Sequence, residues 1–206
     1  MNGSGTAMVQ LEGNRAHVTV KHSGLLAGAP HAQHFHINAK GVCPPESVAK
    51  ERNGKVFLNT TDGAPFYGGI GTSLTTTGDT SPASGLAVDR FPVASKVHYE
   101  RTIHLSDEAA KSLREGTGVV VVHGIDFNGN GKYDDNLGPS DLDPKLPSEA
   151  TNPALCGPLK MAATGAVHGG QGGAQAADTV ALTAAGGLLT VAAGAVYLRR
   201  RSSRQS

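Results

Sequence analysis

Residues 6–21 read TAMVQLEGNRAHVTVK, and this stretch decides the fold class. Two runs rich in β-forming residues, 6–11 and 16–21, flank the polar sequence EGNR at residues 12–15. This pattern predicts an antiparallel β-hairpin. Val18 and Val20 are two residues apart, so they share one face of their strand and are expected to contribute to a core.

Outside this hairpin the chain predicts more strands than helices. The 206 residues include 28 Gly and 11 Pro but no Trp, a composition typical of one domain with many short elements. Only Ser106–Glu115 predicts a helix, with Ser106 as its N-cap. Long loops are expected at 38–83 and 124–155. Further strands are expected at His31–Ile37, Ser84–Val88, Lys96–Leu105 and Gly118–His123. We therefore predict an all-β domain over residues 1–159, a β-sandwich or Greek-key barrel.

The charge of the chain is concentrated at its C-terminal end. The formal net charge is +1, but four of the 18 basic residues lie within the last eight positions, so 14 basic residues remain against 17 acidic ones. The chain before this basic end, called the body below, therefore has no general surface for neutralising phosphates, and nucleic-acid binding is disfavoured. The four are Arg199, Arg200, Arg201 and Arg204.

The C-terminal region predicts a membrane anchor. Residues 160–178 are rich in Gly and Ala and indicate a flexible stalk, and Thr179–Leu198 is a run of 20 uncharged residues. A helix of that length matches the hydrocarbon layer of a membrane. The arginines of the tail, 199–206, are expected to stay in the cytoplasm, which places the body outside. The alternatives are a buried Ala-rich helix of a soluble domain, or tail anchoring with a cytoplasmic body.

An exported body requires an export signal. Met1–Gly5 has neither a basic segment nor an apolar segment, so we expect the signal to lie upstream of the given sequence. Export would also decide the state of the two cysteines, Cys43 and Cys156, which should pair in an oxidising compartment. The alternatives are two buried free thiols or a fragment of a metal site.

Three histidines are candidate metal ligands. His34 and His36 lie two residues apart, so on a strand both imidazoles project from the same face. His123 follows a run of four valines that is apolar enough for a buried strand, where an imidazole usually needs a partner. Neutral imidazole is a ligand for copper, zinc, iron and nickel. The alternative for His34 and His36 is an ordinary solvent-facing pair. We interpret the remaining histidines as surface residues, with His98 as the first exception to expect: His17, His22, His98, His104 and His168.

In this order along the chain, the residues resemble the Cu/Zn superoxide dismutase-like superfamily. The resemblance rests on His31-x-x-His34-x-His36, Cys43 soon after it, His123 at the end of a valine-rich strand, and Cys156-Gly157. The sequence Gly3–Ala7 before the hairpin also resembles the related chordin-type (CHRD) modules. Together the matches cover roughly residues 3–159.

The resemblance implies a Greek-key β-barrel, a Cys43–Cys156 bridge and a copper ion held by three catalytic histidines. It assigns His31 a supporting, hydrogen-bonding role. Redox cycling of the copper would dismutate superoxide. The copper ligands that it implies are His34, His36 and His123.

Two departures from the family favour a different class of function. Residues 37–97 contain no histidine, so the normal zinc site is absent, and Pro153 stands where the family has an arginine that guides superoxide. The competing hypothesis is a non-catalytic, CHRD-like module that serves structure, adhesion or copper storage in the cell envelope.

A second candidate metal site follows the valine-rich strand. Oxygen side chains occupy positions one, three, five and nine of a loop with Gly131 at position six, a pattern typical of calcium loops. Position twelve is Leu137 rather than Glu, so a bidentate ligand would have to come from Asp135, Asp141 or Asp143. The alternative is an ordinary surface turn. The candidate calcium ligands are Asp126, Asn128, Asn130 and Asp134.

Overall fold

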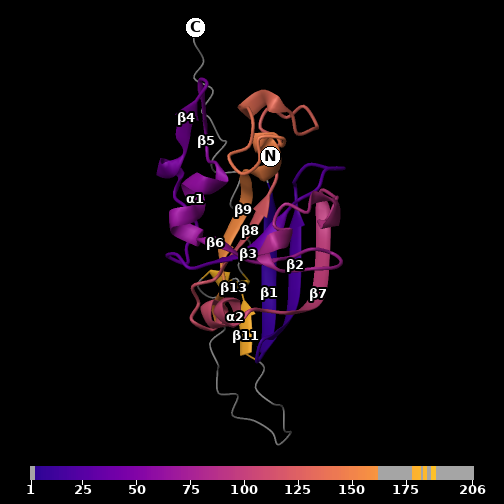
Figure 1. Ribbon diagram of the computed structural model, residues 1–206, viewed down its shortest axis with the longest axis vertical. Helices are drawn as coiled ribbons and strands as arrows, with labels where there is room; N and C mark the ends of the chain where they lie inside the picture. Colours follow the sequence, from indigo (N-terminus) through magenta and orange to yellow (C-terminus); the bar gives the residue numbers. More distant parts are fainter. Residues whose placement is uncertain (1–2, 162–177, 182, 185–186, 189–206) are drawn as a thin grey trace, which may run out of the picture.

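The computed structural model describes residues 3–161, 178–181, 183–184 and 187–188, and its main elements are two antiparallel β-sheets (Figure 1). The first sheet has the strand order β10-β11-β1-β2-β7 and the second the order β6-β3-β8-β9. The prediction of an all-β fold is therefore confirmed at the level of antiparallel sheets. The strands of the first sheet are β1 (Ser4–Glu12), β2 (Arg15–Ser23), β7 (Lys96–His104), β10 (Lys160–Met161) and β11 (Asp178–Ala181).

The predicted hairpin forms the centre of the first sheet. Strands β1 and β2 pair in register from Ser4 opposite Ser23 to Glu12 opposite Arg15, and Gly13 takes a positive φ in the turn between them. Burial alternates along both strands, as the sequence pattern requires. Each strand therefore presents one apolar face to the interior.

The second sheet differs from the first because its two central strands are buried on both faces. These strands are β3 (Gln33–Ile37) and β8 (Val119–His123), and they pair with each other. Their outer neighbours are β6 (Gly69–Ser73) and β9 (Pro153–Pro158). One face of β3 and β8 contributes to the main core, and the other is covered by the segments that connect the strands.

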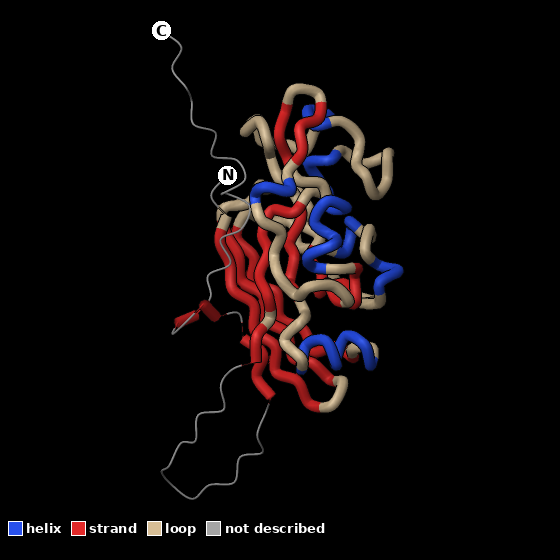
Figure 2. The backbone as a smooth tube through the Cα atoms, turned by 90° about the vertical axis from the view of Figure 1, so that its left-hand side faces the viewer, coloured by secondary structure: helices blue, strands red, loops and turns tan. Residues whose placement is uncertain are grey.

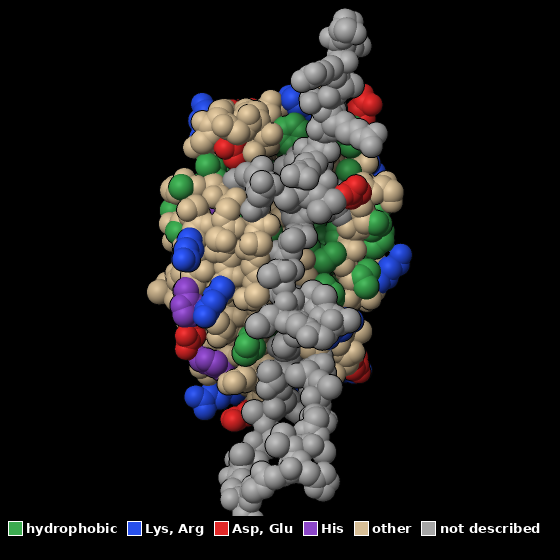
Figure 3. Space-filling model, turned by 180° about the vertical axis from the view of Figure 1, so that it is seen from behind, with side chains coloured by type: hydrophobic (Ala, Val, Ile, Leu, Met, Phe, Trp, Pro, Cys, Tyr) green, Lys and Arg blue, Asp and Glu red, His purple; other side chains and the backbone are tan. Residues whose placement is uncertain are grey.

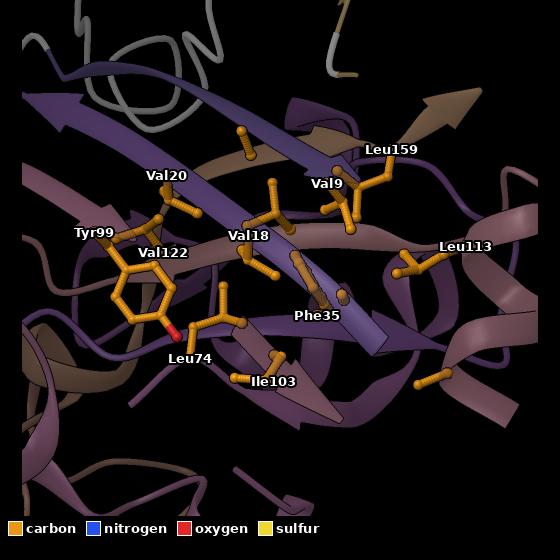
Figure 4. Packing of buried hydrophobic residues seen from close by; sticks show 14 of the residues in the cluster. Val9, Val18, Val20, Phe35, Leu74, Tyr99, Ile103, Leu113, Val122 and Leu159 are labelled. Atoms are coloured by element: carbon orange, nitrogen blue, oxygen red, sulfur yellow. The ribbon is translucent and has the colours of Figure 1, made fainter. Parts of the chain in front are cut away.

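The main core combines side chains from both sheets (Figure 4). Burial of such apolar surface is the dominant favourable contribution to folding, at about 25 cal/mol per Å². The labelled members from the first sheet are Val9, Val18, Val20, Tyr99 and Ile103, and those from the second sheet are Phe35 and Val122, with Leu74 directly after β6.

The helices are short and lie on one side of the strands in Figure 2. The predicted helix is present as α2 (Asp107–Arg114), and the Ser106 hydroxyl accepts a hydrogen bond from the Ala109 N–H at 3.1 Å. Helices α1 (Thr60–Tyr67) and α3 (Ser148–Thr151) fall within the two predicted long loops. The remaining elements are β4 (Lys50–Arg52), β5 (Lys55–Phe57), β12 (Thr183–Ala184), β13 (Gly187–Leu188) and four 3₁₀ helices at Glu46–Val48, Pro82–Ser84, Val88–Arg90 and Asp135–Leu137.

The predicted strand at Ser84–Val88 is wrong. The chain forms 3₁₀ turns on either side of Gly85, which has a right-handed helical conformation with φ −57° and ψ −32°. Pro82 starts the first of these turns, since its fixed φ suits the first position of a helical turn. The segment therefore forms local turn hydrogen bonds instead of pairing with a neighbouring strand, and the Gly85 carbonyl faces the buried His34.

The predicted C-terminal elements fall largely outside the described residues. No helix in the described part of the chain is long and apolar enough to cross a membrane. Within the predicted span 179–198, the described positions belong to β11, β12 and β13. The rest of that span, most of the predicted stalk 160–178, the tail 199–206 and His168 lie outside the described residues.

Charged side chains are mixed on the face shown in Figure 3, where blue, red and purple groups alternate over the part that the grey atoms leave visible. On the first sheet, the Glu100 carboxylate lies 3.3 Å from His17 and 3.7 Å from His98. Both imidazoles are substantially exposed, so His98 is not the exception among the surface histidines. That exception is His22, which is 3% exposed, so its prediction as a surface residue is wrong.

Candidate metal centre

The three candidate ligands share the outer face of the second sheet. His34 lies opposite Val121 in the β3–β8 pair, and opposite residues of an antiparallel pair project to the same side. His36 is two residues along β3, and His123 is two residues along β8, so both are on the same face as His34. Phe35 lies between the two β3 histidines and points the other way, into the main core.

The histidines converge closely enough to hold a metal ion. One ligand nitrogen from each ring lies within 4.8 Å of the other two, and each side chain is 2% exposed. The ring centroids of His34 and His123 are 5.1 Å apart, and those of His36 and His123 are 5.9 Å apart. Among the described residues, no other group of three His, Cys, Asp or Glu side chains is arranged in this way.

One nitrogen of each ring faces a backbone carbonyl. His34 Nε2 is 3.0 Å from the Gly85 oxygen, His36 Nδ1 is 2.9 Å from the Gly68 oxygen, and His123 Nδ1 is 2.6 Å from the Thr151 oxygen. A carbonyl only accepts hydrogen bonds, so each of these nitrogens must carry the proton and donate. This arrangement fixes both the tautomer and the orientation of each ring.

The second nitrogen of each ring is then an unprotonated lone-pair donor. His34 Nδ1, His36 Nε2 and His123 Nε2 are buried and find no hydrogen-bond partner among the described residues. Leaving a buried polar atom unsatisfied costs about 1–3 kcal/mol, and here three such atoms lie together. A metal ion coordinated by these nitrogens would satisfy all three, so the donor set fits a bound metal.

Burial keeps the three imidazoles neutral, which is the form that binds metal. Desolvation is the largest effect on each ring: it lowers the pKa of His36 to about 3 and that of His123 to about 4. The pKa of His34 is also well below its ordinary value, because of burial and then because of its neighbours His123 and His36. Protons therefore compete little with a metal ion near neutral pH.

The three carbonyls come from three separate segments that cover the outer face of the sheet. Gly68 follows α1, Gly85 lies between the two 3₁₀ turns, and Thr151 ends α3. Gly68 has φ +90°, and a Cβ atom there would lie 1.8 Å from the Ile37 oxygen. Only glycine allows this close approach, which brings the Gly68 carbonyl to His36.

A chain of hydrogen bonds connects two of these segments behind the ligands. The Thr60 hydroxyl donates to the backbone carbonyl oxygen of Thr151 at 2.6 Å. This carbonyl oxygen therefore accepts from both Thr60 and His123. The Tyr67 hydroxyl donates to the Thr60 oxygen at 2.5 Å, and the Tyr67 ring packs edge-on against His36 with centroids 4.6 Å apart. Helix α1 therefore positions both His36 and His123.

A disulfide ties the covering segments to the sheet. Cys43 and Cys156 are bonded, with their Cα atoms 5.8 Å apart and a sequence separation of 113 residues. Cys156 lies opposite Val121 in the β8–β9 pair, and both belong with Tyr67 to a small apolar cluster. The bridge therefore fixes the start of the 38–83 segment beside the strand that ends in His123.

His31 lies behind His123 and is not part of the converging group. It is fully buried, and its Nε2 is 2.9 Å from the Leu26 oxygen. Its Nδ1 lies 3.0 Å from the His123 carbonyl oxygen and 3.1 Å from the Tyr133 hydroxyl. His31 thus holds the backbone at the end of β8. His22 packs edge-on against His31, with ring centroids 5.8 Å apart.

The site opens onto a cavity of about 210 Å³. Its walls come from β3, α1, α3, the turns around Gly85, and the segment before α3. Among the described residues that line it, none is Asp, Glu, Lys or Arg. Pro153, at the position where the resemblance would place an arginine, is buried in β9. No Lys or Arg on the described walls of the cavity therefore takes the place of that arginine.

The predicted calcium loop has a different arrangement. Asp126 is buried, and its carboxylate accepts hydrogen bonds from the backbone N–H groups of Gly129, Asn130 and Gly131 at 2.7–3.0 Å. The side-chain amides of Asn128 and Asn130 donate to the Asp134 carboxylate at 3.4 and 2.5 Å. The loop oxygens therefore already have N–H partners within the loop.

The acidic residues considered for position twelve also have other contacts. Asp141 accepts from the N–H and the hydroxyl of Thr61, and Asp143 accepts from the Lys145 N–H. Asp135 begins a 3₁₀ turn. The acid that faces the loop is Glu149 on α3, which is fully buried and accepts from the N–H groups of Phe127 and Asp134 at 2.8 Å each.

In comparisons with known proteins, no protein-family model, no curated protein and no solved structure matches this chain. The function therefore has to be inferred from the side chains themselves.

Proposed function

We propose that residues 1–159 form a copper-binding domain of the Cu/Zn superoxide dismutase-like type. The observation that carries this proposal is the set of three buried nitrogens without a hydrogen-bond partner, which converge within 4.8 Å. The copper ligands would be His34 Nδ1, His36 Nε2 and His123 Nε2. Each ring is held for this role by a hydrogen bond to a backbone carbonyl on its other nitrogen.

The chemistry of the donor set favours copper. All three donors are imidazoles, which suit Cu and Zn, and copper is the tightest binder among the first-row divalent metals. No carboxylate joins the converging group among the described residues, so oxygen-preferring ions such as Mg²⁺ and Ca²⁺ are disfavoured there. Bound copper would supply one-electron redox chemistry, and superoxide dismutation is the reaction that the resemblance implies.

The proposal includes an exported domain that is anchored to the membrane by Thr179–Leu198. The described positions of this segment are strand residues in the structure, so the segment would have to become helical in the membrane. The Cys43–Cys156 disulfide supports this location, because such bonds persist in oxidising compartments and are rare in the cytosol. Protease added to intact cells should then digest the body and spare the arginine tail. Complete protection of the body would place it in the cytoplasm.

The decisive experiment measures copper stoichiometry and affinity on metal-stripped protein. We expect one Cu²⁺ per chain in the wild type, and a loss of at least 100-fold in affinity in His34→Ala, His36→Ala and His123→Ala. His22→Ala is the matched control, because His22 is equally buried but lies outside the converging group. Equal copper binding in all four variants would overturn the assignment.

A non-catalytic copper-binding role has one specific observation in its favour. The described walls of the cavity carry no cation, so nothing on them attracts a small anion such as superoxide. Superoxide turnover of the copper-loaded protein separates the two roles. A turnover rate far above that of the copper-free protein would favour a dismutase. A background rate at full copper occupancy would favour a role in copper storage or a structural role.

A further inference from the structure

The cavity beside the three histidines has walls that are mainly apolar. Its side chains come from separate segments of the chain, so the apolar lining is not the interior of one element. Leu86 and Val88 follow Gly85, whose carbonyl meets His34, while Leu142 and Leu146 precede α3. Ala64 of α1 and Ile70 of β6 complete the apolar wall.

The polar groups of the cavity either already donate a hydrogen bond within the protein or can only accept one. The Thr60 hydroxyl donates to the Thr151 oxygen, and the Thr61 hydroxyl donates to the Asp141 carboxylate at 2.6 Å. The free nitrogens of the three histidines are acceptors, because the other nitrogen of each ring carries the proton. In the metal-free protein, a ligand in this cavity therefore meets lone pairs and methyl groups, but no positive charge on the described walls.

The mouth of the cavity exposes apolar side chains to solvent. Leu86 is 40% exposed, Val88 is 37% exposed and Leu142 is 39% exposed. These three account for three of the seven large apolar side chains that are exposed in the described part of the chain, and all three line this one cavity. The carboxylate of Asp141 accepts a hydrogen bond from Thr61, which also lines the cavity, and this negative charge would repel an anion.

We propose that this cavity binds a small uncharged molecule with an apolar body, about the size of one substituted aromatic ring. The inference deepens the proposed function, on which it rests, by naming the class of ligand that reaches the metal centre. An apolar cavity of about 150 Å³ is enough for benzene, so the present volume of about 210 Å³ admits a ring with one small substituent. A macromolecule does not fit a space of this size.

The test compares two probes that share a ring and differ in charge. Benzyl alcohol and benzoate are titrated into metal-stripped protein, because a bound Zn²⁺ would itself attract the benzoate carboxylate. Binding is followed by the methyl signals of Leu, Ile and Val in ¹H–¹³C spectra. We expect benzyl alcohol to bind saturably, with a dissociation constant at least tenfold lower than that of benzoate. The shifted signals should be those of Ile70, Leu86, Leu142 and Leu146.

A charge placed at the mouth should reverse this preference. Leu86→Arg introduces a cation at an exposed position, so its fold is expected to be unaffected, and benzoate should then bind at least as tightly as benzyl alcohol. Val93→Arg is the matched control, because Val93 is 55% exposed and does not line the cavity. The control should keep the wild-type preference.

Zinc stoichiometry measured on reloaded portions of the same samples keeps the two proposals separable. One zinc per chain without saturable binding of benzyl alcohol, or with tighter binding of benzoate, would overturn the ligand class and leave the metal site intact. Shifts confined to Val42, Val56 or Val93 would also overturn it. Self-association of the chain through Leu86, Val88 and Leu142, without binding of either ring, would show that the mouth is a protein contact and not a ligand site.

Discussion

Two regions of this molecule have side chains typical of metal sites, and they differ in how the potential ligands are satisfied. In the histidine cluster, three ring nitrogens are buried, point to a common centre and have no hydrogen-bond partner among the described residues. In the loop 126–135, the carboxylates of Asp126 and Asp134 accept hydrogen bonds from nearby N–H groups. The first region has buried acceptor nitrogens without a hydrogen-bond donor, whereas the carboxylates of the second region have donors.

The difference arises from how each region is positioned. The histidines stand on neighbouring strands of a sheet, so the sheet fixes their directions before any ligand is present. The loop organises itself through bonds between residues only a few positions apart, such as that from the Asp126 carboxylate to the Gly131 N–H. A loop of this kind needs no ion to keep its shape, whereas the histidine cluster carries an energetic cost that an ion would remove.

The largest expected effect concerns the disulfide, which fixes the segments that cover the histidine cluster. Replacing both cysteines, Cys43→Ser with Cys156→Ser, should lower the free energy of unfolding by about 5 kcal/mol in the chain-entropy model for a loop of this length. Urea unfolding of metal-free protein measures this loss. Copper affinity should also fall, because the segment that carries Tyr67 and Gly68 is no longer fixed to β9.

Amide protection sharpens the same experiment. The N–H of Gly131 bonds to Asp126 within the loop itself, so its hydrogen exchange should proceed by local opening and have the same rate in both proteins. An unchanged free energy of unfolding in the double cysteine variant would show that the bridge does not stabilise the fold.

The second expected effect separates the two regions by pH. The folded-state pKa values of His36 and His123, about 3 and about 4, lie below the ordinary value of 6.5, so the unfolded chain binds more protons on acidification. Stability from these groups is complete above pH 6.5 and is lost as the pH falls toward 4. We expect metal-free protein to lose on the order of 3 kcal/mol over this window.

The loop should respond at lower pH. Hydrogen bonds from the Asn136 N–H, first, and from Asn130 and Asn128 lower the pKa of Asp134 below its ordinary value of 3.8, so its contribution is lost only as the pH falls below that value. Urea unfolding of metal-free protein at pH 7.5, 6.5, 5.5 and 4.5 tests the response of the histidines, which should occur before that of the loop. A free energy of unfolding that stays constant from pH 7.5 to 4.5 would contradict the buried, neutral histidines. His22→Phe should give a shallower dependence, because burial lowers the pKa of His22 to about 4.

Much of the fold could be predicted because its pattern is local. Alternation of apolar residues predicts β1 and β2, and the cap at Ser106 with its following acids predicts α2. The same alternation could have placed His22 correctly, because Ala16, Val18, Val20 and His22 follow one another at every second position of β2. A histidine at the end of such a buried stripe is a core residue.

Other elements could not be predicted because their residues are weak formers of regular structure. Strand β6 reads GIGTS, and β9 reads PALCGP with proline at both ends, so neither has a clear strand pattern. The ligands of the candidate metal site follow from a period of two on β3 and from the end of β8. The carbonyls that orient them do not, because every residue has a carbonyl and only tertiary structure selects those of Gly68, Gly85 and Thr151.

The third expected effect tests whether orientation behind the ligands matters. Thr60→Val removes the hydroxyl that donates to the Thr151 oxygen but leaves that oxygen to accept from His123. We expect a loss of about 1 kcal/mol in stability and a weakening of copper binding by up to about tenfold. Competition with a chelator of known affinity measures the second effect.

Thr61→Val is the matched control for this variant. Its hydroxyl donates to Asp141 on the exposed side of α1 and contacts neither a ligand nor a carbonyl that holds one. Copper affinity should be unchanged in the control. Equal losses in Thr60→Val and Thr61→Val would mean that the chain from Thr60 to His123 does not position the site.

The smallest expected effect is that of calcium on the loop 126–135. Because the carboxylate of Asp126 already accepts three backbone N–H groups, an added calcium ion has to compete with these hydrogen bonds for the carboxylate oxygens. We expect 5 mM calcium to raise the melting temperature of the metal-free protein by less than about 2 °C, since a ligand stabilises only in proportion to its occupancy of the folded state. Copper at one equivalent should raise it by more. Asp126→Ala should lower stability by about 1–3 kcal/mol whether or not calcium is present, because it leaves three N–H groups without their acceptor. A large calcium-dependent rise that disappears in Asp126→Ala would show that the loop binds the ion after all, and that internal hydrogen bonds do not distinguish an inert loop from a metal site in this fold.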